Sequence, residues 1–232
     1  MSLITIYHGS SKVIQHPEFG KGNSRNDYGL GFYCTFEIEL AKEWACSTRS
    51  GGFANIYSID VAGLNVMNLD APEYGLLDWL SLLVNNRIFS VDAPIVAEGM
   101  EYLTAHFLPD VAGFDAIKGY RADDSYFTFA MDFLSNTISL RQLSRAMRLG
   151  TLGEQFVLKS QKAFDMLTFV QSEPADGAVY FAKRRDRDKE ARDQYLKRER
   201  RSARQSDDMF MLDILREEMK RGDARLQRNL SQ

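Results

Sequence analysis

Three short blocks of the sequence combine residue types that can hold a planar, polar ligand. The first block is His8-Gly9-Ser10, which follows the apolar run Leu3–Tyr7. A glycine lets a ligand approach the backbone closely, and an imidazole can both donate and accept a hydrogen bond. The second block, residues 29–33 (Gly-Leu-Gly-Phe-Tyr), follows about twenty residues later and enters a predicted strand. The two blocks together predict a pocket where one strand ends and the next begins.

The third block is Gly153-Glu154-Gln155-Phe156-Val157-Leu158, which begins a predicted strand. Neighbouring side chains of a strand point to opposite faces, so Glu154 and Gln155 cannot both point inward unless a bulge intervenes. A glutamine can hydrogen-bond a ligand hydroxyl, but it supplies no net charge. A carboxylate could instead come from the Arg121-Ala122-Asp123-Asp124-Ser125 segment, which lies between a predicted strand and a predicted helix.

The blocks resemble the ADP-ribosyltransferase superfamily in its His-Tyr-Glu branch, which includes diphtheria toxin and the poly(ADP-ribose) polymerases. They are more similar still to a group of uncharacterised bacterial domains assigned to that branch. The resemblance covers three blocks and not the helices between them. It implies an α+β fold with split antiparallel sheets and inserted helices, NAD as the substrate, and no metal.

For the first block, the resemblance implies that His8 hydrogen-bonds the adenosine ribose. The backbone of Gly9 would hold the nicotinamide amide, and Ser10 completes the motif. The alternative for His8 is an ordinary histidine at a strand end.

For the second block, the resemblance implies that Tyr33 stacks on the nicotinamide ring, with Thr35 further along the same block. Trp44 lies eleven residues after Tyr33, where the eukaryotic enzymes carry a second stacking tyrosine. The resemblance therefore predicts a Tyr33–Trp44 pair around nicotinamide. Stacked aromatic pairs contribute about 0.5–1.5 kcal/mol beyond area burial. The alternative for Trp44 is a core residue on an amphipathic helix.

For the third block, the catalytic glutamate of the family falls on Gln155, with Glu154 as the second candidate. A carboxylate about 4 Å from the ribosyl cation would stabilise it by roughly 4 kcal/mol at an effective dielectric constant near 20. That energy corresponds to about a thousandfold in rate. Asp123 or Asp124 could supply the charge or accept a proton.

Arg121 could pair with the pyrophosphate, because a guanidinium matches phosphate in a bidentate manner. The alternatives are a solvated strand end for Glu154, a helix cap for one of the two aspartates, and a surface position for Arg121.

Short strands interleaved with helices predict the elements that position these blocks. Strands are expected at Leu3–Tyr7, Phe32–Thr35, Phe53–Val61, Phe114–Lys118, Gln155–Lys159 and Leu167–Gln171. Helices are expected at Glu37–Ser47, Asp70–Asn85, Ala93–Phe107, Ser125–Leu134, Ser139–Leu149 and Met209–Arg221. Ser139 and Gln142 form a predicted capping box. We expect a catalytic domain over residues 1–182 and a charged helical C-terminal extension over 183–232.

The composition excludes several classes of protein. The chain has 232 residues with 2 cysteines, so a disulfide scaffold is not expected. Neither a secretory signal nor the roughly 20 apolar residues of a membrane helix is recognisable, which predicts a cytoplasmic protein and no membrane partner. Residues 183–206 hold eleven Lys and Arg against five Asp and Glu. Because both signs are interleaved, this segment is either a solvated helix or a nucleic-acid contact.

The resemblance implies a mono-ADP-ribosyltransferase that cleaves NAD and transfers ADP-ribose to a macromolecular acceptor, a protein or a nucleic acid. The resemblance to bacterial domains suggests a toxin or effector, with an antitoxin or regulatory partner on the C-terminal helices. Three alternatives remain open. They are a non-catalytic module that binds NAD or ADP-ribose, an NAD glycohydrolase, and a modifier of nucleic acid.

Overall fold

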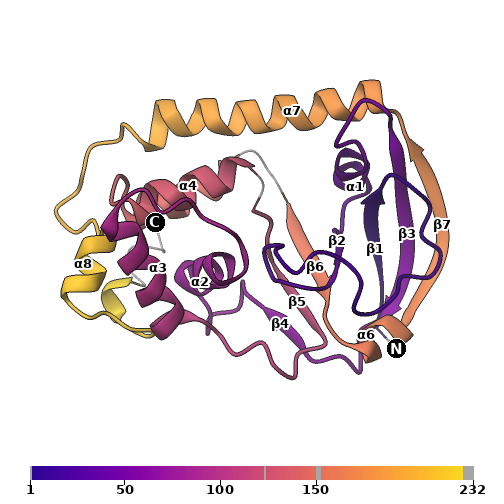
Figure 1. The fold of residues 1–232 in the computed structure, drawn as a ribbon, viewed down its shortest axis with the longest axis horizontal. Coiled ribbons are helices and arrows are strands. Elements are labelled where there is room, and N and C mark those ends of the chain that lie inside the picture. Colours follow the sequence, from indigo (N-terminus) through magenta and orange to yellow (C-terminus); the bar gives the residue numbers. More distant parts are fainter. Residues whose placement is uncertain (1, 123, 150–152, 227–232) are drawn as a thin grey trace. The chain divides into compact units, whose positions relative to one another are not determined.

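The computed structural model describes residues 2–122, 124–149 and 153–226 (Figure 1). Its internal contacts divide the chain into two compact units. Unit 1 comprises Met1–Asp70, Val111–Arg121 and Leu152–Arg187, and unit 2 comprises Ala71–Asp110, Ala122–Thr151 and Asp188–Gln232. All the described strands belong to unit 1, and helices make up unit 2, so the α+β class is confirmed.

Unit 1 contains two sheets. The first sheet has three strands in the order β1-β3-β7, and both pairs are antiparallel. These strands are β1 (Leu3–Ser10), β3 (Gly52–Asp60) and β7 (Leu167–Ala175). β1 is longer than predicted because its pairing with β3 continues through His8, Gly9 and Ser10.

The second sheet has four strands in the order β2-β6-β5-β4. They are β2 (Phe32–Cys34), β6 (Glu154–Leu158), β5 (Ala116–Tyr120) and β4 (Val66–Asn68). The pairs β2–β6 and β5–β6 are antiparallel, whereas β4–β5 is parallel. The prediction omitted β4, because three residues are too few to show an alternating pattern.

Backbone hydrogen bonds join the two sheets next to the site. The amide of Tyr7 donates to the carbonyl of Thr35, and the amide of Thr35 donates to the carbonyl of Tyr7, both at 2.9 Å. An apolar core lies between the sheets and includes residues of β1, β2, β3, β5 and β6. Its buried members are Ile6, Cys34, Tyr57, Ile59, Ala116, Phe156, Leu158 and Ala163. The ends of β1 and β2 are therefore held together by both hydrogen bonds and burial.

Helix α1 (Ile38–Ala45) packs against β1 and β3, as Figure 1 shows. The contact requires glycine at position 9. A Cβ atom at Gly9 would lie 2.0 Å from the carbonyl oxygen of Ala41 and 2.8 Å from Cβ of Trp44. This close approach brings Trp44 next to the His-Gly-Ser block.

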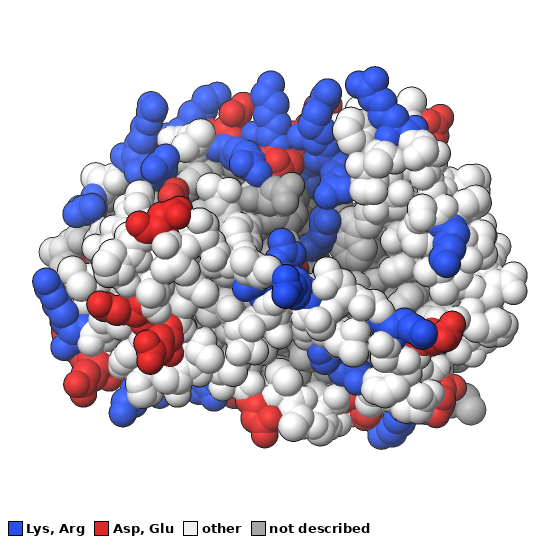
Figure 2. Space-filling view, in the orientation of Figure 1, with Lys and Arg blue, Asp and Glu red and all other residues white. Residues whose placement is uncertain are grey.

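Two further helices begin in unit 1, the short α6 (Gln161–Asp165) and the long α7 (Gly177–Gln194). The composition change expected at residue 183 falls inside α7 and not at the boundary of an element. Figure 2 shows Lys and Arg side chains along α7 with carboxylates among them. Lys183 pairs with Glu39 of α1 at 2.9 Å, and Arg192 pairs with Asp188 of α7 itself at 2.9 Å, so α7 is a charged helix whose cations are partly paired.

Unit 2 is built from helices. They are α2 (Leu76–Asn86), α3 (Pro94–Phe107), α4 (Asp124–Leu134), α5 (Leu140–Ala146), the π-helix η2 (Tyr195–Glu199) and α8 (Met211–Arg216). The predicted start of α2 at Asp70 is wrong. The helix begins after Gly75, because Asp78 accepts a hydrogen bond from the Gly75 amide at 2.6 Å and so caps the helix there.

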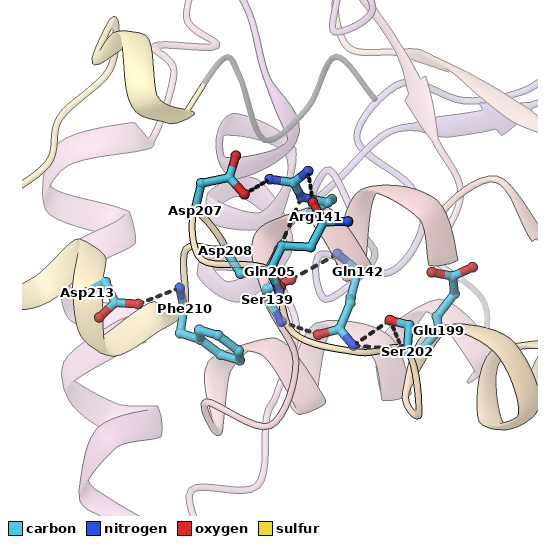
Figure 3. Close-up of polar contacts among 10 residues, drawn as sticks. All are labelled: Ser139, Arg141, Gln142, Glu199, Ser202, Gln205, Asp207, Asp208, Phe210 and Asp213. Carbon is cyan, nitrogen blue, oxygen red and sulfur yellow. Dashed lines mark hydrogen bonds and ion pairs between the residues drawn. The ribbon is translucent and has the colours of Figure 1, made fainter.

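A buried arginine binds the C-terminal segment to α5 within unit 2 (Figure 3). Arg141 is 2% exposed, and its guanidinium lies 2.7 Å from Asp207, 3.1 Å from Asp208 and 2.6 Å from Gln205. The predicted capping box is confirmed. The side-chain oxygen of Gln142 accepts from the backbone N–H of Ser139 at 2.8 Å, and the backbone N–H of Gln142 donates to the Ser139 hydroxyl at 3.2 Å. The Gln142 side chain also donates to the carbonyl of Glu199 at 2.7 Å.

The last helix, α8, is shorter than the predicted Met209–Arg221. Its apolar residues Met211 and Ile214 are fully buried, and Met211 packs closely on Gly99 of α3. Met211 and Ile214 therefore belong to the core of unit 2. No helix in the described part of the chain has the length and apolar character needed to cross a membrane.

We expect Gly9→Ala to lower the free energy of unfolding by about 3 kcal/mol, because the new methyl group would overlap the backbone of α1 and cannot rotate away. Urea unfolding measures this loss. Gly63→Ala is the matched control, since a Cβ at Gly63 meets nothing within 4 Å. Equal stability of the two variants would contradict the packing described for α1.

Candidate active site

Tyr33 and Gln155 lie on the same face of the second sheet. Tyr33 pairs with Val157 across β2 and β6, and Gln155 precedes Val157 by two residues on the same strand. Residues two apart share a face, so Tyr33 and Gln155 are diagonal neighbours with Cα atoms about 7–8 Å apart. The second and third blocks of the sequence thus meet, although more than a hundred residues separate them.

Gln155 is 3% exposed and its amide is oriented by two acceptors. Its Nε2 atom donates to Oδ2 of Asp27 at 2.6 Å and to the carbonyl of Tyr120 at 3.3 Å. Asp27 is itself 5% exposed. The site therefore contains a buried carboxylate that the sequence interpretation did not assign, beside the residue that lacks a charge.

Glu154 points to the opposite face of β6, as the alternation of a strand requires. Its carboxylate lies 2.9 Å from Nζ of Lys118, which also pairs with Asp70 at 3.2 Å. Partial burial and the neighbouring Asp70 raise the pKa of Glu154. The structure thus brings Gln155, and not Glu154, to the face that carries Tyr33.

The loop between Asn26 and Gly31 lies over this face and is held by the hydroxyl of Tyr33. That hydroxyl donates to the carbonyl of Gly29 at 2.6 Å and accepts from the amide of Tyr28 at 3.0 Å. Gly29 has φ of 73°, a conformation that favours glycine. The hydroxyl of Tyr28 donates to the carbonyl of Tyr120 at 2.6 Å. These hydrogen bonds of Tyr28 and Gly29 fix the loop and therefore the position of Asp27.

His8 joins the same network through the backbone of Tyr33. Its Nδ1 atom lies 2.7 Å from the Tyr33 carbonyl, and its ring stacks on Phe32 with centroids 4.3 Å apart. A carbonyl can only accept, so Nδ1 carries the hydrogen and Nε2 is left as an acceptor in the neutral ring. Burial lowers the pKa of His8, which favours this neutral form. An acceptor at Nε2 suits a ribose hydroxyl.

Gly9 presents its backbone polar groups toward the second sheet. The N–H and C=O of Tyr7 point that way, because they bond Thr35. In an antiparallel strand the direction of these groups repeats every second residue, so the N–H and C=O of Gly9 point to the same side. This arrangement is compatible with a ligand amide bound at Gly9.

Ser10 and Thr35 have structural partners in the site. The hydroxyl of Ser10 donates to the carbonyl of Lys12 and accepts from Asn55 Nδ2 at 3.0 Å. The hydroxyl of Thr35 accepts from the amide of Glu37 at 3.3 Å, just before α1. Both side chains therefore shape the backbone around the pocket.

Asn55 is a site residue that the sequence interpretation missed. It is fully buried in β3, where its Nδ2 donates to the carbonyls of His8 and Lys12 at 3.2 and 3.3 Å. Its Oδ1 accepts from the amide of Ile14 at 2.9 Å. The only signal in the sequence is an asparagine between the apolar residues Ala54 and Ile56 of a predicted strand. Asn55 fixes the course of the chain after the His-Gly-Ser block.

Trp44 and Arg121 form a second group of the site in unit 1. The guanidinium of Arg121 lies 4.7 Å from the centroid of the Trp44 ring. The indole N–H of Trp44 is buried, and within the described residues it has no hydrogen-bond partner. Glu43 is 3% exposed and pairs with Arg187, and burial raises its pKa although Arg187 and Arg121 oppose that rise. This group lies beside Gly9, which Trp44 contacts.

The side chains of the two proposed aspartates lie outside the described part of the structure, so their assignment stays a prediction. Asp123 lies outside the described residues. Asp124 is the first residue of α4 and belongs to unit 2, and its side chain is likewise not described.

A cavity of about 960 Å³ in unit 1 opens beside His8 and Tyr33. Other lining residues come from the segment between β1 and β2 and from β2 itself, and they include Lys12, His16, Glu18, Lys21, Asn26 and Phe32. The cavity is large enough for a nucleotide, and its lysines suit an anionic group. Among the described residues, no group of three or more His, Cys, Asp or Glu side chains is arranged to hold a metal ion.

The chain belongs to the family described as Protein of unknown function (DUF3990), which matches residues 4–169. The matched segment contains all three blocks, from β1 to the first residues of β7. No curated protein and no solved structure matches the chain.

We expect stability to fall on acidification because of His8. Its pKa in the folded protein is below the ordinary value of 6.5, so the unfolded chain binds the proton more readily. The stabilisation is therefore present above pH 6.5 and is lost as the pH falls through the folded pKa. Urea unfolding between pH 7.5 and 5 measures this slope.

His8→Gln removes the titrating group, so its slope over this pH range should be smaller than that of the wild type. His16→Gln, at an exposed histidine of the cavity wall, is the control and should keep the wild-type slope. The same slope in His8→Gln and wild type would contradict the buried, neutral state of His8.

Proposed function

We propose that unit 1 binds NAD and that the protein is a mono-ADP-ribosyltransferase, which cleaves NAD and transfers ADP-ribose to a macromolecular acceptor. The observation that carries this proposal is the continuous network from His8 through Tyr33 and the 26–31 loop to Asp27 and Gln155. Residues from all three blocks of the resemblance take part in one site.

The proposed binding mode assigns a role to each part of the site. The adenosine ribose lies at Nε2 of His8, beside the 960 Å³ cavity. The nicotinamide amide bonds the N–H and C=O of Gly9, and its ring lies between Tyr33 and Trp44. The orphan indole N–H of Trp44 and the guanidinium of Arg121 are donors for the polar groups of NAD.

The chemistry resembles glycoside cleavage, in which positive charge develops on the ribose carbon as the bond to nicotinamide breaks. Gln155 accepts a hydrogen bond from a ribose hydroxyl and orients the sugar.

The second candidate is a non-catalytic module that binds NAD or ADP-ribose, and the uncharged Gln155 favours it. A glycohydrolase differs only in using water as the acceptor. A modifier of nucleic acid would use the basic α7, although Lys183, Arg187 and Arg192 already pair with carboxylates of this chain.

A bacterial toxin or effector role also remains part of the proposal, by resemblance. An antitoxin or regulatory partner would meet the exposed charged side chains of α7, since Met211 and Ile214 of α8 are buried within unit 2.

The test is incubation with NAD labelled in the adenosine part, with and without a bacterial cell lysate. We expect wild type to release nicotinamide and to label a macromolecule. Tyr33→Ala and Gln155→Ala should each reduce nicotinamide release by about a hundredfold, an effect of roughly 3 kcal/mol on the barrier. Gln171→Ala, at an exposed glutamine of β7, should match wild type.

Three results separate the candidates. Nicotinamide release without labelling indicates a glycohydrolase. NAD binding without nicotinamide release and without labelling rejects the transferase and supports the binding module. Equal activity of Gln155→Ala and Gln171→Ala would contradict the role of Gln155.

A further inference from the structure

Asp27 is a buried carboxylate in direct contact with the third-block residue. Its Oδ2 atom lies 2.6 Å from Nε2 of Gln155, and the two residues are 5% and 3% exposed. Buried charges are costly unless they are hydrogen-bonded and held in place. A carboxylate retained at this depth beside a glutamine therefore requires an explanation.

The contact determines which end of the Gln155 amide faces a ligand. Its NH₂ group donates both to Asp27 and to the carbonyl of Tyr120. The Oε1 atom of the same planar amide must point away from both acceptors. Among the described residues, none donates a hydrogen bond to Oε1, so this atom is the acceptor that the site offers to a hydroxyl.

The negative charge also acts through the amide. In a chain of hydrogen bonds inside a protein, each group polarises the next. A carboxylate at Nε2 draws positive charge toward the NH₂ group and leaves Oε1 more negative. The pair thus presents a stronger acceptor than an isolated glutamine does.

The surrounding structure fixes the loop that carries Asp27. The Tyr33 hydroxyl bonds Tyr28 and Gly29, and the Tyr28 hydroxyl bonds Tyr120. Lys159 donates to the carbonyls of Tyr28 and Leu30 at 2.5 and 2.6 Å. This many contacts on one short loop hold Asp27 in a single position relative to Gln155.

We propose that Asp27 and Gln155 together take the place of a single catalytic glutamate, with Asp27 as the positioning residue that orients Gln155 and supplies the negative charge. The inference rests on the proposed NAD cleavage. In that reaction the bond from the ribose carbon to nicotinamide breaks, and both electrons leave with nicotinamide, which becomes neutral. The acceptor then donates an electron pair to the ribose carbon and loses its proton to solvent. Asp27 stays ionised throughout.

The test measures nicotinamide release against NAD concentration for Asp27→Asn. This variant keeps the size of the side chain but removes its charge. We expect kcat to fall about a hundredfold while KM for NAD changes less than threefold. Asp165→Asn is the matched control, because Asp165 also accepts from a glutamine, Gln161, at 2.8 Å but on the surface of α6. It should keep the wild-type kcat.

A charge exchange separates this role from a purely structural one. The double variant Asp27→Asn with Gln155→Glu restores the charge and reverses the direction of the hydrogen bond. We expect it to recover kcat to within tenfold of wild type. Gln155→Glu alone places two carboxylates in contact and should lose activity. If Asp27→Asn does not fold, the activity of the double variant still tests the inference.

Two results would overturn this inference but leave the proposed function standing. In the first, wild type releases nicotinamide and the kcat of Asp27→Asn lies within threefold of wild type. In the second, the double variant folds but is no more active than Asp27→Asn. If wild type binds NAD and releases no nicotinamide, both the inference and the proposed function are rejected.

Discussion

The site depends on the fixed position of Tyr33. Its carbonyl holds His8 at 2.7 Å, and its hydroxyl bonds both Tyr28 and Gly29 in the loop that carries Asp27. Asp27 in turn orients Gln155. One residue thus connects the strand end of the first block with the loop of the second, and through that loop with the glutamine of the third. The hydroxyl of Tyr33 is therefore engaged with the loop.

The convergence of the three blocks could be predicted from the sequence, whereas the groups that hold them together could not. Glycine, histidine and aromatic residues carry local signals of strand ends and turns. Asn55 and Asp27 act through hydrogen bonds to residues distant along the chain, and no local pattern shows such partners. The missing carboxylate was assigned to Asp123 and Asp124, whose side chains lie outside the described part of the structure, and that prediction stays open. Asp27, which lies in a loop rich in Gly, Asn and Ser, was not assigned.

The secondary structure shows the same difference between elements set by local residues and elements set by distant contacts. Helix α3 and the capping box at Ser139 were predicted well, because proline and capping side chains act on their own helix. The start of α2 was wrong, since Asp78 caps it later than the Asp-Ala-Pro-Glu pattern suggested. Burial of Met211 and of Arg141 depends on how the C-terminal segment packs within unit 2, which composition does not reveal.

Tryptophan fluorescence tests most directly whether nicotinamide binds beside Gly9 against Trp44, as proposed. The chain has 2 tryptophans, and Trp79 is buried in α2 of unit 2. We expect saturable quenching by NAD that free nicotinamide competes away, that persists in Trp79→Phe and that disappears in Trp44→Phe. Unchanged fluorescence of the folded wild type at millimolar NAD would contradict this binding mode, as would quenching that persists in Trp44→Phe.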